Sequence, residues 1–205
     1  MATMNSPAAT LSTREKLLNQ GVKLLMEQGY HGVGLQTILQ TVGVPKGSFY
    51  HYFASKEAFS AEVIQHYIAP FIGLLETHLS RPETTALQAL DAYFQALIDE
   101  SERRHFKGGC LLGNLMGEIG DTSERCREAL HEAVTAYRDA FRDAIARGQS
   151  EGCFRTDQSA ERMADVLVNS WQGALLRMKI DLSVAPLQGC CDFLLHDYFR
   201  PTQTA

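Results

Sequence analysis

The stretch Gly43-Val-Pro-Lys-Gly-Ser-Phe-Tyr-His-Tyr-Phe53 decides the fold of the N-terminal part of the chain. Gly43 breaks the helical pattern before it. Pro45 suits the first position of a new helix, because its missing N–H would be unpaired there anyway. Two short helices joined by a tight turn form a helix-turn-helix. Phe49 and Phe53 lie four residues apart, so we expect them to anchor the second short helix to the core.

The other side of this short helix carries the side chains expected of a DNA-reading element. Its polar and aromatic residues are Lys46, Ser48, Tyr50, His51 and Tyr52. Such a helix can enter the major groove and bring its N-terminal residues to base edges. Gly47 allows the backbone and a phosphate to approach closely. Lys56 follows in the first turn of the next helix, where backbone N–H groups and the helix dipole favour an anion.

Helical periodicity extends outward from this stretch over almost the whole chain, and no strand alternation interrupts it. Ser12 and Glu15 form a capping box that begins the first helix, and Gly29 is expected to end it. Pro70 is expected to kink or split its helix, and Gly148 and Gly152 to stop another. The pattern predicts an all-α chain of about nine helices, over residues 12–29, 34–41, 45–52, 55 onward, 84–104, 110–119, 123–148, 159–182 and 186–199.

The charge of the chain is distributed unevenly. Of 205 residues, 45% are hydrophobic and 21% are charged, which suits a packed globular protein. The net charge is −5, but residues 1–56 carry +3 and residues 57–205 therefore carry −8. A basic head on an acidic body is typical of a DNA-binding module joined to a different domain. We expect the boundary between residues 56 and 57.

Neither a membrane segment nor a metal site is expected. No window approaches the roughly 18 unbroken apolar residues that span a bilayer, and residues 1–10 lack the features of a secretion signal. The cysteines at 110, 126, 153, 190 and 191 are odd in number and have no C-x-x-C repeat. This pattern favours reduced thiols in a cytosol. We expect no metal, no cofactor and a cytoplasmic protein.

The head resembles the signature of the TetR family of transcriptional regulators. The matching positions, in order, are Gly29-Tyr30, Ile38, Gly43-Val44, Lys46-Gly47, Phe49-Tyr50, Tyr52-Phe53 and Ser55-Lys56-Glu57. By position, the resemblance implies that the recognition helix begins with Lys46, Gly47 and Ser48. It also implies that Tyr50 and His51 contact phosphates and bases.

One departure from the family pattern changes which residue is expected to contact a DNA phosphate. The family often has threonines where this chain has Gly34-Leu35, so Gln36 or Thr37 is expected to contact the phosphate instead. Lys56 matches the lysine that holds a phosphate. The resemblance further implies a homodimer on a palindromic operator in double-stranded DNA, and repression relieved by a small-molecule effector. Two recognition helices then meet half-sites roughly 34–36 Å apart.

The body is implied by the same resemblance to be a ligand-binding and dimerisation domain. Its last two helical segments, 159–182 and 186–199, would build a four-helix interface between two copies. Their apolar stripes, with Cys190 or Cys191, would pack against the partner. The alternative is that these stripes face the core of their own chain.

Cys110 lies in a glycine-rich segment, Lys107-Gly-Gly-Cys-Leu-Leu-Gly-Asn-Leu-Met-Gly-Glu118. Its spacing fits no P-loop or dinucleotide fingerprint, so we interpret it as a turn leading into a helix that starts at Cys110. A cysteine at a helix N-terminus has a lowered pKa and is more reactive. Trp171, Leu175 and Lys179 recur every four residues and share one helix face. If that face meets Cys110, Lys179 favours the thiolate further.

This combination resembles a TetR subgroup that includes repressors of reductases clearing reactive electrophiles, and a relative that responds to acrylate. The resemblance lies in Gly109-Cys110-Leu111, Gly113-Asn114-Leu115, and Gly173-Ala174 with Lys179. It implies an effector site that comprises Cys110, Asn114, Trp171, Leu175 and Lys179.

Two modes of induction stay open. In one, an electrophile or oxidant acts on Cys110. In the other, a small unsaturated acid binds reversibly, and Lys179 or Arg177 pairs with its carboxylate. A thiol enzyme is a remote alternative, because it would need a base and an oxyanion site. Only His105 lies near Cys110 in the sequence, so we expect no enzyme.

Overall fold

The computed structural model describes residues 11–201, so the interpretation of residues 1–10 lies outside the described residues. Within 11–201 every regular element is a helix. In chain order the helices are α1 (Thr13–Gly32), α2 (Leu35–Val42), α3 (Lys46–Tyr52), α4 (Lys56–Leu79), α5 (Ala86–Arg103), α6 (Leu111–Ile119), α7 (Glu124–Ser150), α8 (Ala160–Asp181), α9 (Ala185–Cys191) and the π-helix η1 (Asp192–Tyr198). The all-α prediction is confirmed.

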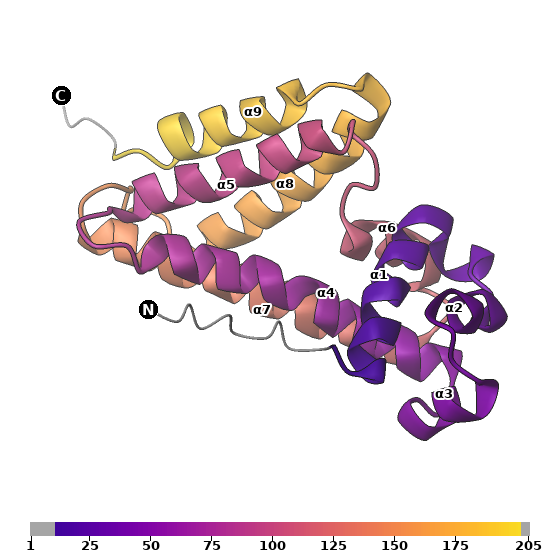
Figure 1. Ribbon diagram of the computed structural model, residues 1–205. Helices are drawn as coiled ribbons and strands as arrows, with labels where there is room; N and C mark the ends of the chain where they lie inside the picture. Colours follow the sequence, from indigo (N-terminus) through magenta and orange to yellow (C-terminus); the bar gives the residue numbers. More distant parts are fainter. Residues whose placement is uncertain (1–10, 202–205) are drawn as a thin grey trace, which may run out of the picture.

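The helices form a small head and a larger body (Figure 1). Helices α1, α2 and α3 lie together at one end, and α4 runs from this head along the body beside α7. In the body, α8 packs on α7 and α9, and α5 packs on α4, α7 and α9. The short helix α6 packs against α1, α4 and α7. Both α4 and α6 therefore join the head to the body.

The capping residues predicted for the head helices lie at or next to their expected positions. The Glu15 N–H donates to Ser12 Oγ at 3.2 Å, and the Ser12 N–H donates to Glu15 Oε2 at 2.8 Å, so the predicted capping box is confirmed. Gly29 has φ 71° and interrupts α1, although a further turn continues to Gly32. Pro45 is the cap before α3, one position earlier than expected.

The structure changes three of the predicted helix breaks, and tertiary packing explains the change at Gly148. Gly148 does not stop α7, which continues to Ser150, and Gly152, at φ 74°, lies just past the end of the helix as expected. A Cβ at Gly148 would lie 2.2 Å from Cδ2 of Phe154, so this glycine makes room for a buried ring. Pro70 lies inside α4, which is not split. The last predicted helix divides into α9 and η1 at Asp192.

Helix α4 is apolar enough, by length and composition alone, to cross a membrane. In this fold, however, α4 packs against α1, α5, α6 and α7. Its apolar residues Phe59, Val63 and Ile64 are buried in the core that it shares with those helices. A core helix of a globular protein shows the same composition.

Candidate functional site

Helix α3 has one buried side and one exposed side. Phe49 and Phe53 are buried, with ring centroids 5.3 Å apart. Both rings pack on Phe59 of α4, at centroid distances of 5.4 and 5.0 Å. Tyr50 and Tyr52 are 50% and 38% exposed. The predicted anchoring by Phe49 and Phe53 is confirmed, and it turns the rest of α3 toward solvent.

The other residues predicted to contact DNA lie mostly at the surface of α2 and α3. The exposed ones are Gln36, Thr37, Lys46, Gly47 and His51, and Ser48 is half-buried. Within residues 11–201, the side chains of Lys46, Tyr50 and His51 make no hydrogen bond or ion pair. Gly43, at φ 69°, makes the left-handed turn that sets α3 against α2. The tertiary structure therefore leaves this polar edge available to a partner.

Lys56 is placed differently from the other predicted DNA contacts. Its Nζ donates to the Tyr30 carbonyl oxygen at 2.5 Å and lies 4.3 Å from the centroid of the Tyr30 ring. Burial lowers the pKa of Lys56. In this structure the Lys56 ammonium ties the start of α4 to the last turn of α1.

An apolar cavity of about 150 Å³ lies inside the body. Side chains of α4, α5, α6, α7 and α8 line it, and its apolar walls include Ile68, Phe71, Leu97, Leu112, Val134 and Met178. A dry apolar cavity of roughly this volume holds a molecule of benzene size. The cavity suits a small organic ligand.

Three of the predicted effector residues meet at this cavity, and two lie beside it. Cys110, Trp171 and Leu175 line the wall. Lys179 Nζ donates to Asn114 Oδ1 at 3.4 Å, and Asn114 Nδ2 donates to the Gly108 carbonyl at 3.0 Å. Asn114 and Lys179 thus hold the glycine turn that carries Cys110.

Arg177 and Lys179 do not line the cavity, whereas two other cations do. Arg177 pairs with Asp181 at 2.9 Å on the surface. Arg104, from the end of α5, and Lys107, from the turn after it, line the cavity instead. Arg104 lies outside any motif, and Lys107 begins the glycine-rich segment, but no sequence signal distinguished either from an ordinary solvated cation.

Two polar residues with apolar neighbours in the sequence were also missed. Tyr67 lies on α4 among apolar residues, and Gln172 lies next to Trp171 on α8. Both line the cavity. The helical spacing showed only that Tyr67 faces inward, and it could not show that a cavity lies there.

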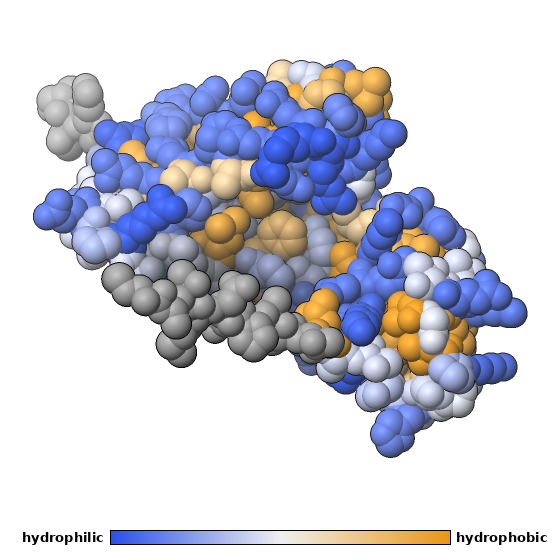
Figure 2. Space-filling model, viewed as in Figure 1, coloured by the Kyte–Doolittle hydropathy of each residue, from blue (hydrophilic) through white to orange (hydrophobic). Residues whose placement is uncertain are grey.

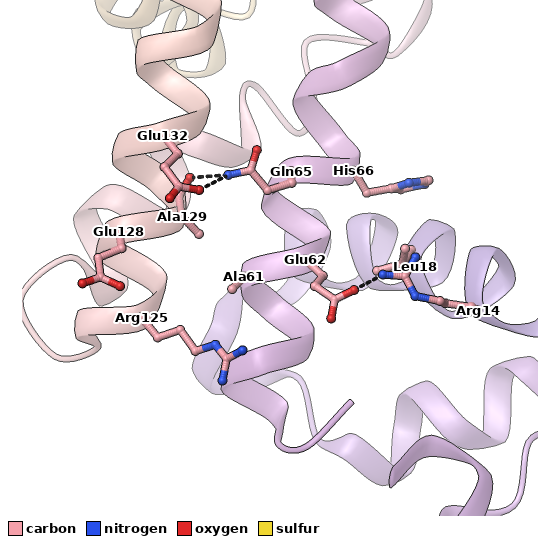
Figure 3. A pocket seen from close by; sticks show the side chains of 10 residues that line it. All are labelled: Arg14, Leu18, Ala61, Glu62, Gln65, His66, Arg125, Glu128, Ala129 and Glu132. Atoms are coloured by element: carbon pink, nitrogen blue, oxygen red, sulfur yellow. Dashed lines mark hydrogen bonds and ion pairs between the residues drawn. The ribbon is translucent and has the colours of Figure 1, made fainter. Parts of the chain in front are cut away.

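A second hollow, of about 420 Å³, separates the head from the body between α1, α4 and α7 (Figure 3). Charged and polar side chains line it and pair with one another. Arg14 forms an ion pair with Glu62, and Gln65 Nε2 donates to Glu132 at 3.1 Å (Figure 3). The Arg14–Glu62 pair joins α1 of the head to α4, and the Gln65–Glu132 bond joins α4 to α7.

Comparison with known proteins assigns the two parts of the chain. Residues 17–63 match the family described as "Bacterial regulatory proteins, tetR family". Residues 86–194 match "Tetracyclin repressor-like, C-terminal domain". The chain belongs to the TetR family.

Named TetR-family relatives match over most of this chain. The transcriptional repressor DhaR of Mycobacterium sp. (strain GP1) is 35% identical, covering 87% of this chain and 88% of DhaR. The repressor NemR of Escherichia coli (strain K12) is 34% identical, covering 86% and 88%. The regulator AcuR of Cereibacter sphaeroides is 33% identical, covering 89% and 83%.

Two crystal structures of TetR-family proteins share the fold. Reduced E. coli NemR superposes with a TM-score of 0.83 at 32% identity, covering 90% of this chain and 95% of NemR. The regulatory protein TetR from Rhodobacter sphaeroides gives 0.82 at 30% identity, covering 90% and 98%. TetR-family regulators are dimers that bind operator DNA and small-molecule effectors.

Proposed function

We propose that this chain is a homodimeric, cytoplasmic transcriptional repressor, which leaves a palindromic operator when a small molecule acts at the cavity beside Cys110. One observation carries the DNA-binding part: α3 buries Phe49 and Phe53, and Lys46, Tyr50 and His51 on its other side make no hydrogen bond or ion pair within residues 11–201. Two of the named relatives are transcriptional repressors. The 56/57 boundary then falls at the first turn of α4.

The proposed DNA contacts follow from position and exposure. Helix α3 supplies Lys46, Gly47, Ser48, Tyr50, His51 and Tyr52, and α2 supplies Gln36 and Thr37. The N-terminal residues of α3 read base edges, whereas cations and hydroxyls position the helix on phosphates. Lys56 Nζ donates one of its three N–H groups to the Tyr30 carbonyl, and the remaining N–H groups can donate to a phosphate.

The proposed dimer interface uses a part of α8 and η1 that the sequence stripes did not indicate. Met163, Leu167 and Met178 are buried within their own chain, so that stripe faces its own core. Cys191 is buried as well. The apolar side chains left exposed on this side are Leu176, Ile180, Leu182 and Phe193, at 46%, 78%, 66% and 58% exposure. Figure 2 shows apolar surface over the turn between α8 and α9.

Induction through Cys110 is the first of two candidate modes. Cys110 lines the cavity. Burial raises the pKa of Cys126, of Cys190 to about 11 and of Cys191 to about 12, so these thiols are poor nucleophiles at neutral pH. The second mode is reversible binding of a small carboxylate, and Arg104 and Lys107 at the cavity favour it. No histidine lines the cavity, which leaves a thiol enzyme without an imidazole base.

Operator binding tests the proposal. Purified protein is titrated against the DNA upstream of its own gene and against a shuffled fragment of equal length, at several salt concentrations. We expect a preference for the upstream fragment, and loss of that preference when but-2-enal or a small carboxylate is added. Equal affinity for both fragments at every salt concentration would overturn the proposed function.

A further inference from the structure

A third hollow, of about 660 Å³, lies between α1 of the head and the parts of the body formed by α8 and the connection from α5 to α6. Figure 1 shows this connection running from the body to the side of α1. The charged residues that line this basic hollow are Lys23, Glu27, Arg104, Lys107 and Lys179. Four cations and one carboxylate thus face the same space, in a chain whose net charge is −5.

The four cations of the basic hollow have no counter-charge among the residues that the structure describes. The side chains of Lys23, Arg104 and Lys107 form neither an ion pair nor a hydrogen bond there. Lys179 Nζ donates only to the neutral Oδ1 of Asn114, at 3.4 Å. The single carboxylate in the lining pairs with none of them. Like charges that face one another repel and create a positive potential, so the group that this arrangement lacks is an anion.

Two of these cations are positioned by a glycine turn. At Gly108, whose φ is 88°, a Cβ would lie 3.2 Å from Nη2 of Arg104 and 2.7 Å from Cε of Met26. At Gly109, whose φ is 67°, a Cβ would lie 3.0 Å from Cδ of Lys179. The Arg104 guanidinium and the Lys179 stem therefore pack against backbone that only glycine leaves open. Packing of this kind orders the two side chains before a ligand arrives and reduces the entropy that binding would cost.

The size and the other walls of the basic hollow indicate an organic ligand with several charges. Ligand pockets range over roughly 300–1,000 Å³, and the basic hollow lies within that range. Val22 and Met26 add apolar surface from α1, and Tyr67 adds a ring from α4. A guanidinium binds carboxylates and phosphates with two parallel hydrogen bonds, whereas an ammonium acts as a point charge. Phosphate and carboxylate groups thus both suit the set of donors.

We propose that the basic hollow is a second ligand site, which binds a small organic polyanion with at least two phosphate or carboxylate groups between Lys23 of the head and Arg104 and Lys107 of the body. Cys110 lines the inner cavity and not the basic hollow, so this site is separate from the proposed induction through Cys110. A bound polyanion replaces the repulsion between cations of the head and of the body by attraction to a shared partner. It therefore holds α1 against the body.

Calorimetric titration of the full chain without DNA tests this assignment. Pyrophosphate is the phosphate probe, citrate is the carboxylate probe, and acetate is the matched anion with a single charge. Potassium chloride keeps the ionic strength constant, because screening alone changes the affinity between exposed charges. The variants are Lys23→Gln, Lys23→Arg and Arg104→Gln. Arg162→Gln is the matched control, since Arg162 is an exposed arginine of α8 that does not line the basic hollow.

We expect pyrophosphate, citrate or both to bind with a Kd below about 1 mM, and acetate to bind far more weakly. Lys23→Gln and Arg104→Gln should each raise that Kd about tenfold, because each removes a charge-assisted hydrogen bond. Lys23→Arg and Arg162→Gln should stay within about twofold of wild type.

The identity of the probe that binds distinguishes a phosphate-bearing ligand from a polycarboxylate. The inference fails if neither polyanion binds at about 10 mM. It fails equally if Lys23→Gln and Arg104→Gln keep the wild-type affinity, because the anion then binds elsewhere on the chain. Operator binding and the response at Cys110 are measured separately, with DNA, so a failure here leaves the proposed function standing.

Discussion

Glu118 accepts a hydrogen bond from the backbone N–H of Tyr30 at 2.8 Å, and its other carboxylate oxygen accepts from the N–H of His31 at 2.8 Å. Gly29 makes this contact possible, because a Cβ there would lie 2.6 Å from Glu118 Oε2. Glu118 lies near the end of α6, and Cys110 caps the start of the same helix. Helix α6 thus connects the cavity wall to the turn that precedes α2.

Glu118→Gln is expected to weaken the response of the head to the effector. A charged acceptor that holds two N–H groups becomes a neutral amide, and a hydrogen bond to a charged group contributes about 1.5–3 kcal/mol. The ratio of operator Kd with and without effector measures the coupling between the sites, and we expect it to fall about tenfold. Glu124→Gln, an exposed charge on α7, is the control. An unchanged ratio in Glu118→Gln would show that the signal takes another route.

Lys46→Ala is expected to weaken operator binding and to flatten its dependence on salt. Each lysine–phosphate contact releases about one counterion, so the log–log slope should fall by about one unit for each Lys46 in contact. Fluorescence anisotropy at several salt concentrations measures the slope. Lys23→Ala is the control, because Lys23 faces the groove that contains Arg104 and Lys107. A slope equal to that of wild type would rule out the Lys46 contact.

Cys110→Ser is expected to abolish release of the operator by aldehydes and quinones. Serine keeps the size of the side chain but removes the thiolate nucleophile. Operator binding is followed during but-2-enal treatment, and intact mass is measured on the same samples. If the serine variant releases DNA as wild type does, induction is reversible, and Arg104 and Lys107 become the residues to test with small carboxylates.

Ile180→Glu is expected to dissociate the dimer. Ile180 is 78% exposed in the single chain, and burying such a side chain contributes about 1.5–3 kcal/mol. Because both subunits of a two-fold dimer carry the substitution, the interface loses this contribution twice. Sedimentation velocity at micromolar concentration should show a monomer, whereas Leu11→Glu, an exposed site in the head, should leave the dimer intact. A dimeric Ile180→Glu would place the interface elsewhere.

Phe53→Ala is expected to lower the stability of the protein, whereas Tyr52→Ala, at the adjacent position, is expected to affect operator binding with little change in stability. Phe53 is buried between Phe49 and Phe59, and truncating such a ring costs about 3–5 kcal/mol. Tyr52 is 38% exposed, so its loss should change the free energy of unfolding by about 0.5 kcal/mol. Urea denaturation measures stability, and anisotropy measures operator affinity. A stable Phe53→Ala variant would contradict the proposed anchoring.

Local sequence patterns predicted the positions of the helices well, because capping and helix-breaking residues act on neighbours within a few positions along the chain. The Ser12 capping box and the Gly43 turn lie where the sequence placed them. The prediction failed at Gly148, where a contact with Phe154 outweighed the ordinary tendency of glycine to end a helix. In the head, the spacing of Phe49 and Phe53 was enough to separate the buried side of α3 from its exposed side.

The amino-acid sequence by itself determined that the chain is all-helical, that its head is a helix-turn-helix, and that Cys110 begins a helix. These properties depend on neighbours along the chain. Tertiary structure alone decided that Tyr67, Arg104 and Gln172 surround one cavity, and that Lys179 braces the turn before Cys110 without entering the cavity. The cavity exists only where α4, α5, α6, α7 and α8 pack together, and no local pattern reports the distance between side chains so far apart in the sequence.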